Sequence, residues 1–202
     1  ITITTRLMAV SETIVREFFE LHGFFVRQNR KHIAPKREDD EVDFYVHNPN
    51  GSAEESEVPF VLESATDLVS LSRAVVVVKA WHTEVFTQAV LAHAPEMFRF
   101  AGPETFARAT EAFGGPGPLT KILVIPALPA SGDARQQSID LLHSKGIDAV
   151  VPFRVMLSDL IEHIEVNRNY QKSDLLQIIR ILKNYDLFAP PQLELFEAPL
   201  TR

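Results

Sequence analysis

The feature that most constrains this chain is the run of four valines at 75–78, followed directly by Lys79 in the stretch RAVVVVKAW. Valine is branched at Cβ and favours strands over helices. A strand with one face in water alternates apolar and polar residues, whereas an uninterrupted apolar run is typical of a strand covered on both faces. The run therefore predicts a central strand of an α/β fold.

The segments on either side of this run support an α/β fold. After the glycine- and proline-rich stretch at 114–118, patterns of strands and helices alternate at 119–128, 133–145, 147–153, 155–164 and 173–185, with Ser173 or Asp174 capping the last helix. Such alternation predicts crossover connections and a mixed, mostly parallel sheet covered on both faces.

Before the valine run the order of elements is helix, strand, strand. A first helix starts near Thr5 or Ser11 and stops at Gly23, and two strands then form a hairpin. We also expect a short strand and two helices in the stretches that flank the valine run. The predicted ranges are 24–31 and 41–47 for the hairpin, 60–64 for the short strand, and 83–98 and 103–113 for the helices.

Length and composition indicate one domain in a reducing compartment. With 202 residues, of which 46% are hydrophobic, the chain can bury one full core, so we expect a single domain over 1–188 and an extended tail over 189–202. The absence of cysteine excludes disulfides and thiolate metal sites. No apolar run reaches the roughly 18–20 residues of a membrane helix, so we expect a cytoplasmic protein without membrane contact.

Several common site motifs do not occur. There is no GxGxxG, GxxxxGK[ST], GxSxG or HExxH pattern, so dinucleotide, P-loop, serine hydrolase and zinc protease sites are not predicted. The formal net charge of −7 argues against a protein that coats nucleic acid generally, but it allows a local basic patch.

The charged residues of two strands suggest a site. Side chains alternate along a strand, so Lys79 continues the face of Val75 and Val77, and Asp43 shares a face with Glu41 and Tyr45. A carboxylate and a lysine from neighbouring strands can meet at a sheet edge. Such a pair can hold a divalent cation and position an attacking water.

Three local stretches resemble one family. SETIVREFFELHGF, with Glu12, is similar to the opening helix of archaeal-type Holliday junction resolvases; Asp43 in EVDFYV and Lys79 in AVVVVKAW match the second and third strands of PD-(D/E)xK nucleases. The resemblance implies a restriction-endonuclease-like mixed sheet flanked by helices. It also implies Mg²⁺ or Mn²⁺ held by Asp43 and Glu12, with Lys79 beside the attacking water, and a DNA substrate.

The chain departs from the family at one informative position. The family has an acid two residues before the lysine, and here that position is Val77. Glu84 and Glu63 are the candidates for an acid that has moved to a neighbouring element.

Ordinary structural roles remain open for the three matched residues. Lys79 can return a buried strand to water, Asp43 can lie on the solvated face of an edge strand, and Glu12 can favour the helix macrodipole.

A basic run follows the first strand. Arg27, Arg30, Lys31, Lys36 and Arg37 lie within 27–37 and are candidate contacts for phosphate, while an exposed hairpin of mixed charge is the structural alternative. The leading interpretation is a Mg²⁺-dependent nuclease or a degenerate relative. The alternative is a non-catalytic nucleic-acid-binding or assembly module, and a third is a small-molecule α/β enzyme. The last helix and tail are a candidate homodimer interface.

Overall fold

The computed structural model describes residues 2–28, 42–51 and 58–188, with side chains described from Val10 onward. The chain divides into two compact units, Ile1–Leu160 and Ile161–Arg202. The first unit contains the whole sheet. The predicted boundary between residues 188 and 189 falls inside the second unit, and the predicted tail lies outside the described residues.

The first unit is built on a five-stranded sheet with the strands in sequence order. The first two pairings are antiparallel and the last two are parallel. The sheet is therefore mixed, as predicted, but half of its pairings rather than most are parallel. The strands are β1 (Phe25–Gln28), β2 (Phe44–His47), β3 (Arg73–Val78), β4 (Thr120–Ile125) and β5 (Ala149–Pro152).

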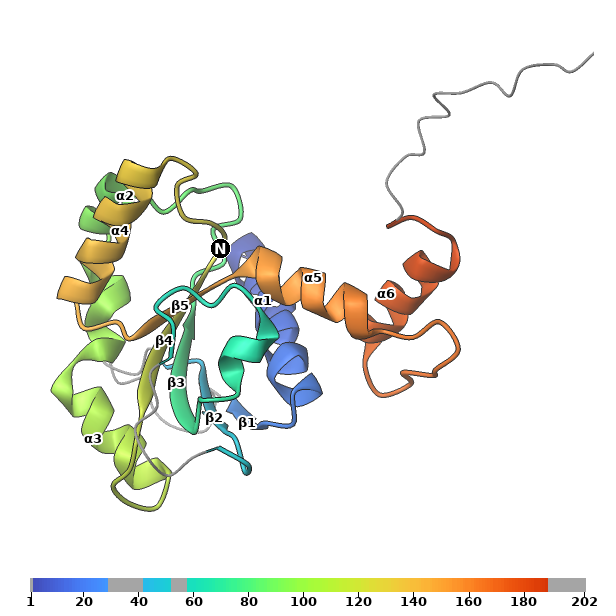
Figure 1. Ribbon diagram of the computed structural model, residues 1–202, viewed down its shortest axis with the longest axis horizontal. Helices are drawn as coiled ribbons and strands as arrows, with labels where there is room; N and C mark the ends of the chain where they lie inside the picture. The colour runs from blue at the N-terminus through green and yellow to red at the C-terminus, as the bar shows by residue number, and fades with distance from the viewer. Residues whose placement is uncertain (1, 29–41, 52–57, 189–202) are drawn as a thin grey trace, which may run out of the picture. The chain divides into compact units, whose positions relative to one another are not determined.

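The valine run forms β3, the middle strand of the sheet. Val75 to Val78 are all buried, and β3 pairs with β2 on one edge and with β4 on the other. Helices cover both faces of the sheet, as Figure 1 shows. The prediction of a central strand buried on both faces is confirmed.

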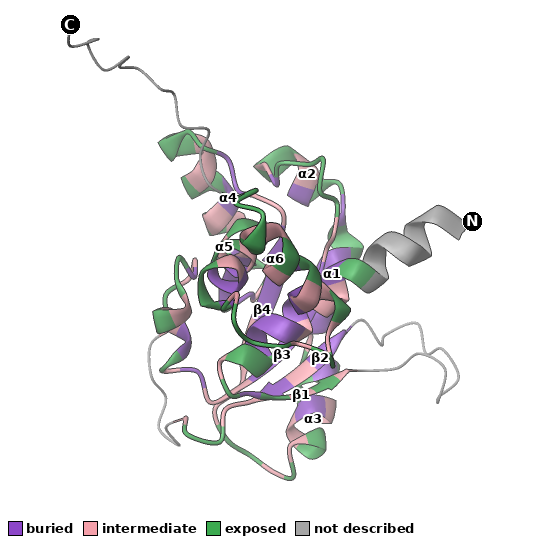
Figure 2. Cartoon of the chain, turned by 90° about the vertical axis from the view of Figure 1, so that its right-hand side faces the viewer, coloured by how far each residue is buried: buried purple, intermediate pink, exposed green. Residues whose placement is uncertain are grey.

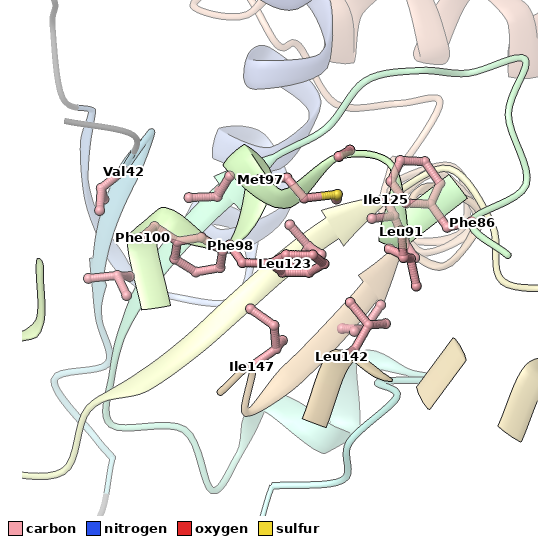
Figure 3. Packing of buried hydrophobic residues seen from close by; sticks show 14 of the residues in the cluster. Val42, Phe86, Leu91, Met97, Phe98, Phe100, Leu123, Ile125, Leu142 and Ile147 are labelled. Atoms are coloured by element: carbon pink, nitrogen blue, oxygen red, sulfur yellow. The ribbon is translucent and has the colours of Figure 1, made fainter. Parts of the chain in front are cut away.

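One face carries three helices and an apolar cluster that includes Val75 and Val77 of β3 (Figure 3). The helices α2 (Gln88–Ala92), α3 (Pro103–Ala112) and α4 (Gly132–Ser144) lie on this side in Figure 1. We call this group of buried residues the apolar cluster. Its other members include Val42, Phe86, Leu91, Met97, Phe98, Phe100, Ala109, Leu123, Ile125 and Leu142.

The opposite face is covered by α1 (Thr2–Leu21). Phe18 and Phe19 of this helix are buried, and Figure 2 shows buried residues along the described part of α1 and along the strands. Gly23 ends the helix with a φ of 80°, a conformation that costs glycine little. The predicted first helix and its stop are confirmed.

Two predicted elements differ from the structure. The helix expected over 83–98 is a loop at 79–87, followed by α2 and by the 3₁₀ helix η2 (Pro95–Ala101). Pro95 has no amide hydrogen and disfavours helical geometry at Ala94, whose φ and ψ are −125° and 60°. The strand expected over 60–64 is one parallel bridge, between Val61 and Val150 of β5. A further 3₁₀ helix, η1 (Ala65–Leu68), follows this bridge.

The last two helices are α5 (Phe153–His163) and α6 (Asp174–Asn184). The Ser173 side chain caps α6 by accepting a hydrogen bond from the Leu176 amide, as predicted. Lys183 of α6 donates to the Ile161 carbonyl at 2.6 Å. Among the described residues, no helix has the length and apolar character needed to cross a membrane.

The apolar cluster predicts that alanine substitutions of two phenylalanines differ greatly in their effect on the free energy of unfolding. Phe100→Ala removes a ring with 0% exposure from the cluster and should lower the free energy of unfolding by about 3–5 kcal/mol. Phe106→Ala on α3 removes a ring that is 41% exposed and should cost much less. Urea unfolding of both variants measures the difference. Equal losses would contradict the described packing.

Candidate functional site

Asp43 lies immediately before β2, where the strand pairing is irregular. Phe44 is paired with Val76 of β3, yet the Val76 carbonyl also accepts a hydrogen bond from the Asp43 amide at 3.0 Å. Two residues thus face one, which is the arrangement of a β-bulge. Bulges change the direction in which a side chain points.

The side-chain contacts of β2 agree with a bulge. Val42 belongs to the apolar cluster, and Tyr45 packs against the same cluster. In a regular strand, residues 42 and 45 would point to opposite faces. The alternation therefore slips by one residue between them. The prediction that Asp43 shares a polar face with Tyr45 is wrong, because the bulge breaks the period and Asp43 is buried, with 7% exposure.

The Asp43 carboxylate closes the end of the β2–β3 ladder. Its Oδ2 accepts a buried hydrogen bond from the Val78 amide at 2.7 Å. Because Val76 bonds to β2, the Val78 amide two residues later also points toward that strand. A side-chain oxygen thus takes the place of a backbone carbonyl. A carboxylate acceptor makes this bond stronger than an ordinary amide–carbonyl bond.

Lys79 follows β3 directly and is half-buried. Its amide donates to the Val124 carbonyl of β4 at 2.9 Å, so its backbone is fixed to the parallel side of the sheet. The Asp43 carboxylate bonds to the amide of the preceding residue, Val78. Residues 43 and 79 therefore lie at the same end of β3.

Glu12 of α1 reaches the same end of the sheet through a glutamine. Gln28 of β1 donates from Nε2 to Glu12 Oε2 at 2.6 Å. Gln28 is paired with Phe44, the residue after Asp43. The sequence analysis did not select Gln28 as a site residue. Strand alternation was an available signal, because it places Gln28 on the opposite face of β1 from Arg27.

A second contact joins α1 to the loop after β3. Ser11 Oγ and His82 Nε2 are hydrogen-bonded at 2.9 Å, and Ser11 is buried. The His82 ring also lies edge-on to Phe153, with centroids 4.6 Å apart. No local sequence pattern indicates this pair, because its members are 71 residues apart.

Val77 has an apolar environment. Its exposure is 0%, and its neighbours in the apolar cluster include Phe86, Met97 and Leu123. This is the position at which the PD-(D/E)xK family has an acid. The structure thus gives Val77 a packing role in the core.

At the magnesium site that the resemblance implies, the described residues provide two carboxylates and no third acid. Mg²⁺ prefers oxygen ligands, usually one or two carboxylates with retained waters. Here Glu12 accepts from Gln28, Asp43 accepts from the Val78 amide, and the third position is an apolar valine. Within 2–28, 42–51 and 58–188, no group of three or more His, Asp or Glu side chains is placed to hold a metal ion.

The two alternative acids lie elsewhere. Glu63 is exposed and forms a salt bridge with Arg135 of α4 at 3.4 Å. Glu84 is exposed in the loop after β3, where its amide donates to the Trp81 carbonyl at 2.8 Å. The Glu63 carboxylate is thus engaged with α4.

Arg27 lies in β1 and is exposed. It is the one member of the predicted basic run within the described part of the chain. Arg30, Lys31, Lys36 and Arg37 lie outside the described residues.

Comparison of the chain with protein-family models, with curated proteins and with solved structures found no match.

The Asp43 hydrogen bond predicts an order of stability. Asp43→Ala leaves the buried Val78 amide without this acceptor and should lower the free energy of unfolding by about 1–3 kcal/mol. Asp43→Asn keeps an oxygen at the same place and should cost less. Urea unfolding at neutral pH measures both changes. An alanine variant as stable as wild type, or more stable, would show that the carboxylate does not support the fold.

Proposed function

We propose that this chain is a non-catalytic nucleic-acid-binding module that retains a restriction-endonuclease-like architecture. The observation that carries the proposal is Val77, which packs in the apolar cluster where the resembled nucleases have an acid. The remaining two carboxylates accept hydrogen bonds from N–H groups of the protein itself. Each of these carboxylates is thus engaged by a donor of the chain itself.

The order of elements supports the architectural part of the proposal. A first helix precedes an antiparallel β1–β2–β3 meander, and a helical crossover leads to β4, which is parallel to β3. This is the order that the PD-(D/E)xK resemblance implies. Fold alone does not establish function, so the proposal depends on the site.

The nucleic-acid part of the proposal rests on the resemblance and on Arg27. This exposed arginine begins the basic run and lies one residue before Gln28, which bonds to Glu12. Arginines bind backbone phosphates by charge and by paired hydrogen bonds, without regard to sequence. A local basic segment can bind nucleic acid even on a chain with a net charge of −7.

The second candidate is the Mg²⁺-dependent nuclease itself. One observation favours it: the hydrogen bonds of the Glu12 and Asp43 carboxylates and the backbone of Lys79 lie toward one end of the sheet. In that case Asp43 and Glu12 would hold the cation and Lys79 would attend the attacking water.

A paired assay distinguishes the two candidates. Fluorescence anisotropy measures binding of labelled single- and double-stranded DNA and RNA, and gel analysis with Mg²⁺ or Mn²⁺ measures cleavage. We expect binding without cleavage. Cleavage by wild type that both Asp43→Ala and Lys79→Ala abolish would establish the nuclease instead. If none of these nucleic acids binds, the proposal of a nucleic-acid-binding module is wrong.

Arg27 provides a charge test of the same proposal. Arg27→Gln should weaken binding and reduce the salt dependence of log Kd by about one unit per lost phosphate contact. Arg99→Gln, which removes an exposed arginine from η2, is the matched control and should leave binding unchanged. Equal effects of the two substitutions would show that only total charge matters.

Val77→Glu tests whether position 77 is a metal-ligand position that has lost its acid or a position in the apolar core. The structure predicts that this carboxylate enters the apolar cluster without a partner and lowers the free energy of unfolding by more than about 4 kcal/mol. Val77→Thr is the nearly isosteric control and should remain folded. A folded Val77→Glu protein that cleaves DNA with Mg²⁺ would contradict the core role. Circular dichroism and the cleavage assay provide the readouts.

A further inference from the structure

Trp81 is exposed and lies flat on a buried ring. Its side chain is 41% exposed although tryptophan is among the largest apolar residues. Its indole is stacked on Phe86, with centroids 5.5 Å apart and planes inclined by 26°. One face of the indole is therefore supported by protein, and the side chain keeps a substantial exposed surface.

The support beneath Trp81 is rigid. Phe86 has 0% exposure and belongs to the apolar cluster, where Figure 3 labels it. The Phe86 amide donates to the Ala127 carbonyl at 2.9 Å, and the Lys79 amide donates to Val124 at 2.9 Å. Both ends of the 79–87 loop are thus tied to β4 and the segment after it.

The middle of the loop is fixed as well. His82, next to Trp81, bonds to Ser11 of α1. The Glu84 amide closes a turn onto the Trp81 carbonyl at 2.8 Å. The orientation of the indole is therefore set by the fold before any ligand arrives, so little conformational entropy is lost on binding.

We propose that Trp81 is a stacking platform for an unpaired nucleobase of a DNA or RNA strand. This inference rests on the proposed nucleic-acid-binding function and specifies the form of the partner. A flat, preoriented aromatic ring binds any base through its π-face, whereas bases in a duplex are already stacked on their neighbours. Single-stranded segments are therefore favoured over duplex at this position.

Arg154 is the candidate cation for the backbone of such a strand. Phe153, whose ring contacts His82, is followed by the exposed Arg154 at the start of α5. Single-strand-binding surfaces combine base stacking on aromatic rings with phosphate attraction by cations, and Arg154 is the candidate for the second role.

The chain provides a direct probe of this site, because Trp81 is its only tryptophan. Intrinsic fluorescence therefore reports on the platform without a label. Titration with an unpaired oligothymidine or oligouridine of about 12 nucleotides should quench this fluorescence, and a duplex of equal length should quench it much less. Anisotropy with a labelled strand measures affinity in parallel.

Substitutions test whether the ring itself binds. Trp81→Leu should weaken binding of the single strand roughly 5- to 150-fold, the range expected for one base–aromatic stack. Trp81→Phe keeps an aromatic face and should recover most of the affinity. Phe106→Leu, at a ring of the same 41% exposure on α3, should have no effect. Thermal unfolding confirms that each variant is folded.

The outcomes separate this inference from the function on which it rests. If wild type binds strands without quenching and Trp81→Leu binds equally well, the stacking platform is wrong and the binding module stands. If wild type binds no strand or duplex, both proposals fail. Equal losses in Trp81→Leu and Phe106→Leu would also overturn the platform.

Discussion

The structure depends on burying β3 on both of its faces and both of its edges. An apolar strand in this position has no access to water, so each of its amides and carbonyls needs a partner within the protein. β2 and β4 supply most of these partners. The bulge at residues 43 and 44 interrupts the ladder before β3 ends, and the Val78 amide then bonds to the Asp43 carboxylate.

This bond gives a structural role to Asp43, the residue whose motif match suggested a catalytic one. Asp43 matches the aspartate of a nuclease motif, yet in this fold it is a buried acceptor for a backbone amide. Glu12 likewise accepts a hydrogen bond from a neighbouring glutamine, and Val77 contributes to the core. At this end of the mixed sheet, both carboxylates accept hydrogen bonds from the protein's own donors. In the proposed binding module, surface groups such as Arg27 and Trp81 would contact the nucleic acid.

Sequence signals predicted the elements whose cause is local. The valine run, the stop at Gly23 and the Ser173 cap each depend on residues within a few positions of one another, and the structure confirms them. The mixed α/β class followed from the alternation of these elements. Pro95 was an available signal against the helix over 83–98, because proline ends or displaces helices.

The details of the site could not be predicted from local sequence signals. The direction of the Asp43 side chain depends on a bulge, which arises from the pairing with β3 and leaves no mark in the alternation of Val42, Phe44 and Val46. The Ser11–His82 contact joins residues 71 positions apart. Strand alternation suggested that Asp43 and Lys79 come together at a sheet edge, whereas Glu12 was added only through the family resemblance. The donors that satisfy the two carboxylates appear only in the folded chain.

The most direct test of this account is a calorimetric titration of Mn²⁺ into the wild-type protein, with Asp43→Asn as the reference. If Glu12 and Asp43 are satisfied by Gln28 and the Val78 amide, no saturable heat should depend on Asp43, and excess Mn²⁺ should not raise the unfolding temperature. A single saturable site that disappears in the asparagine variant would contradict the account and restore the metal-dependent nuclease.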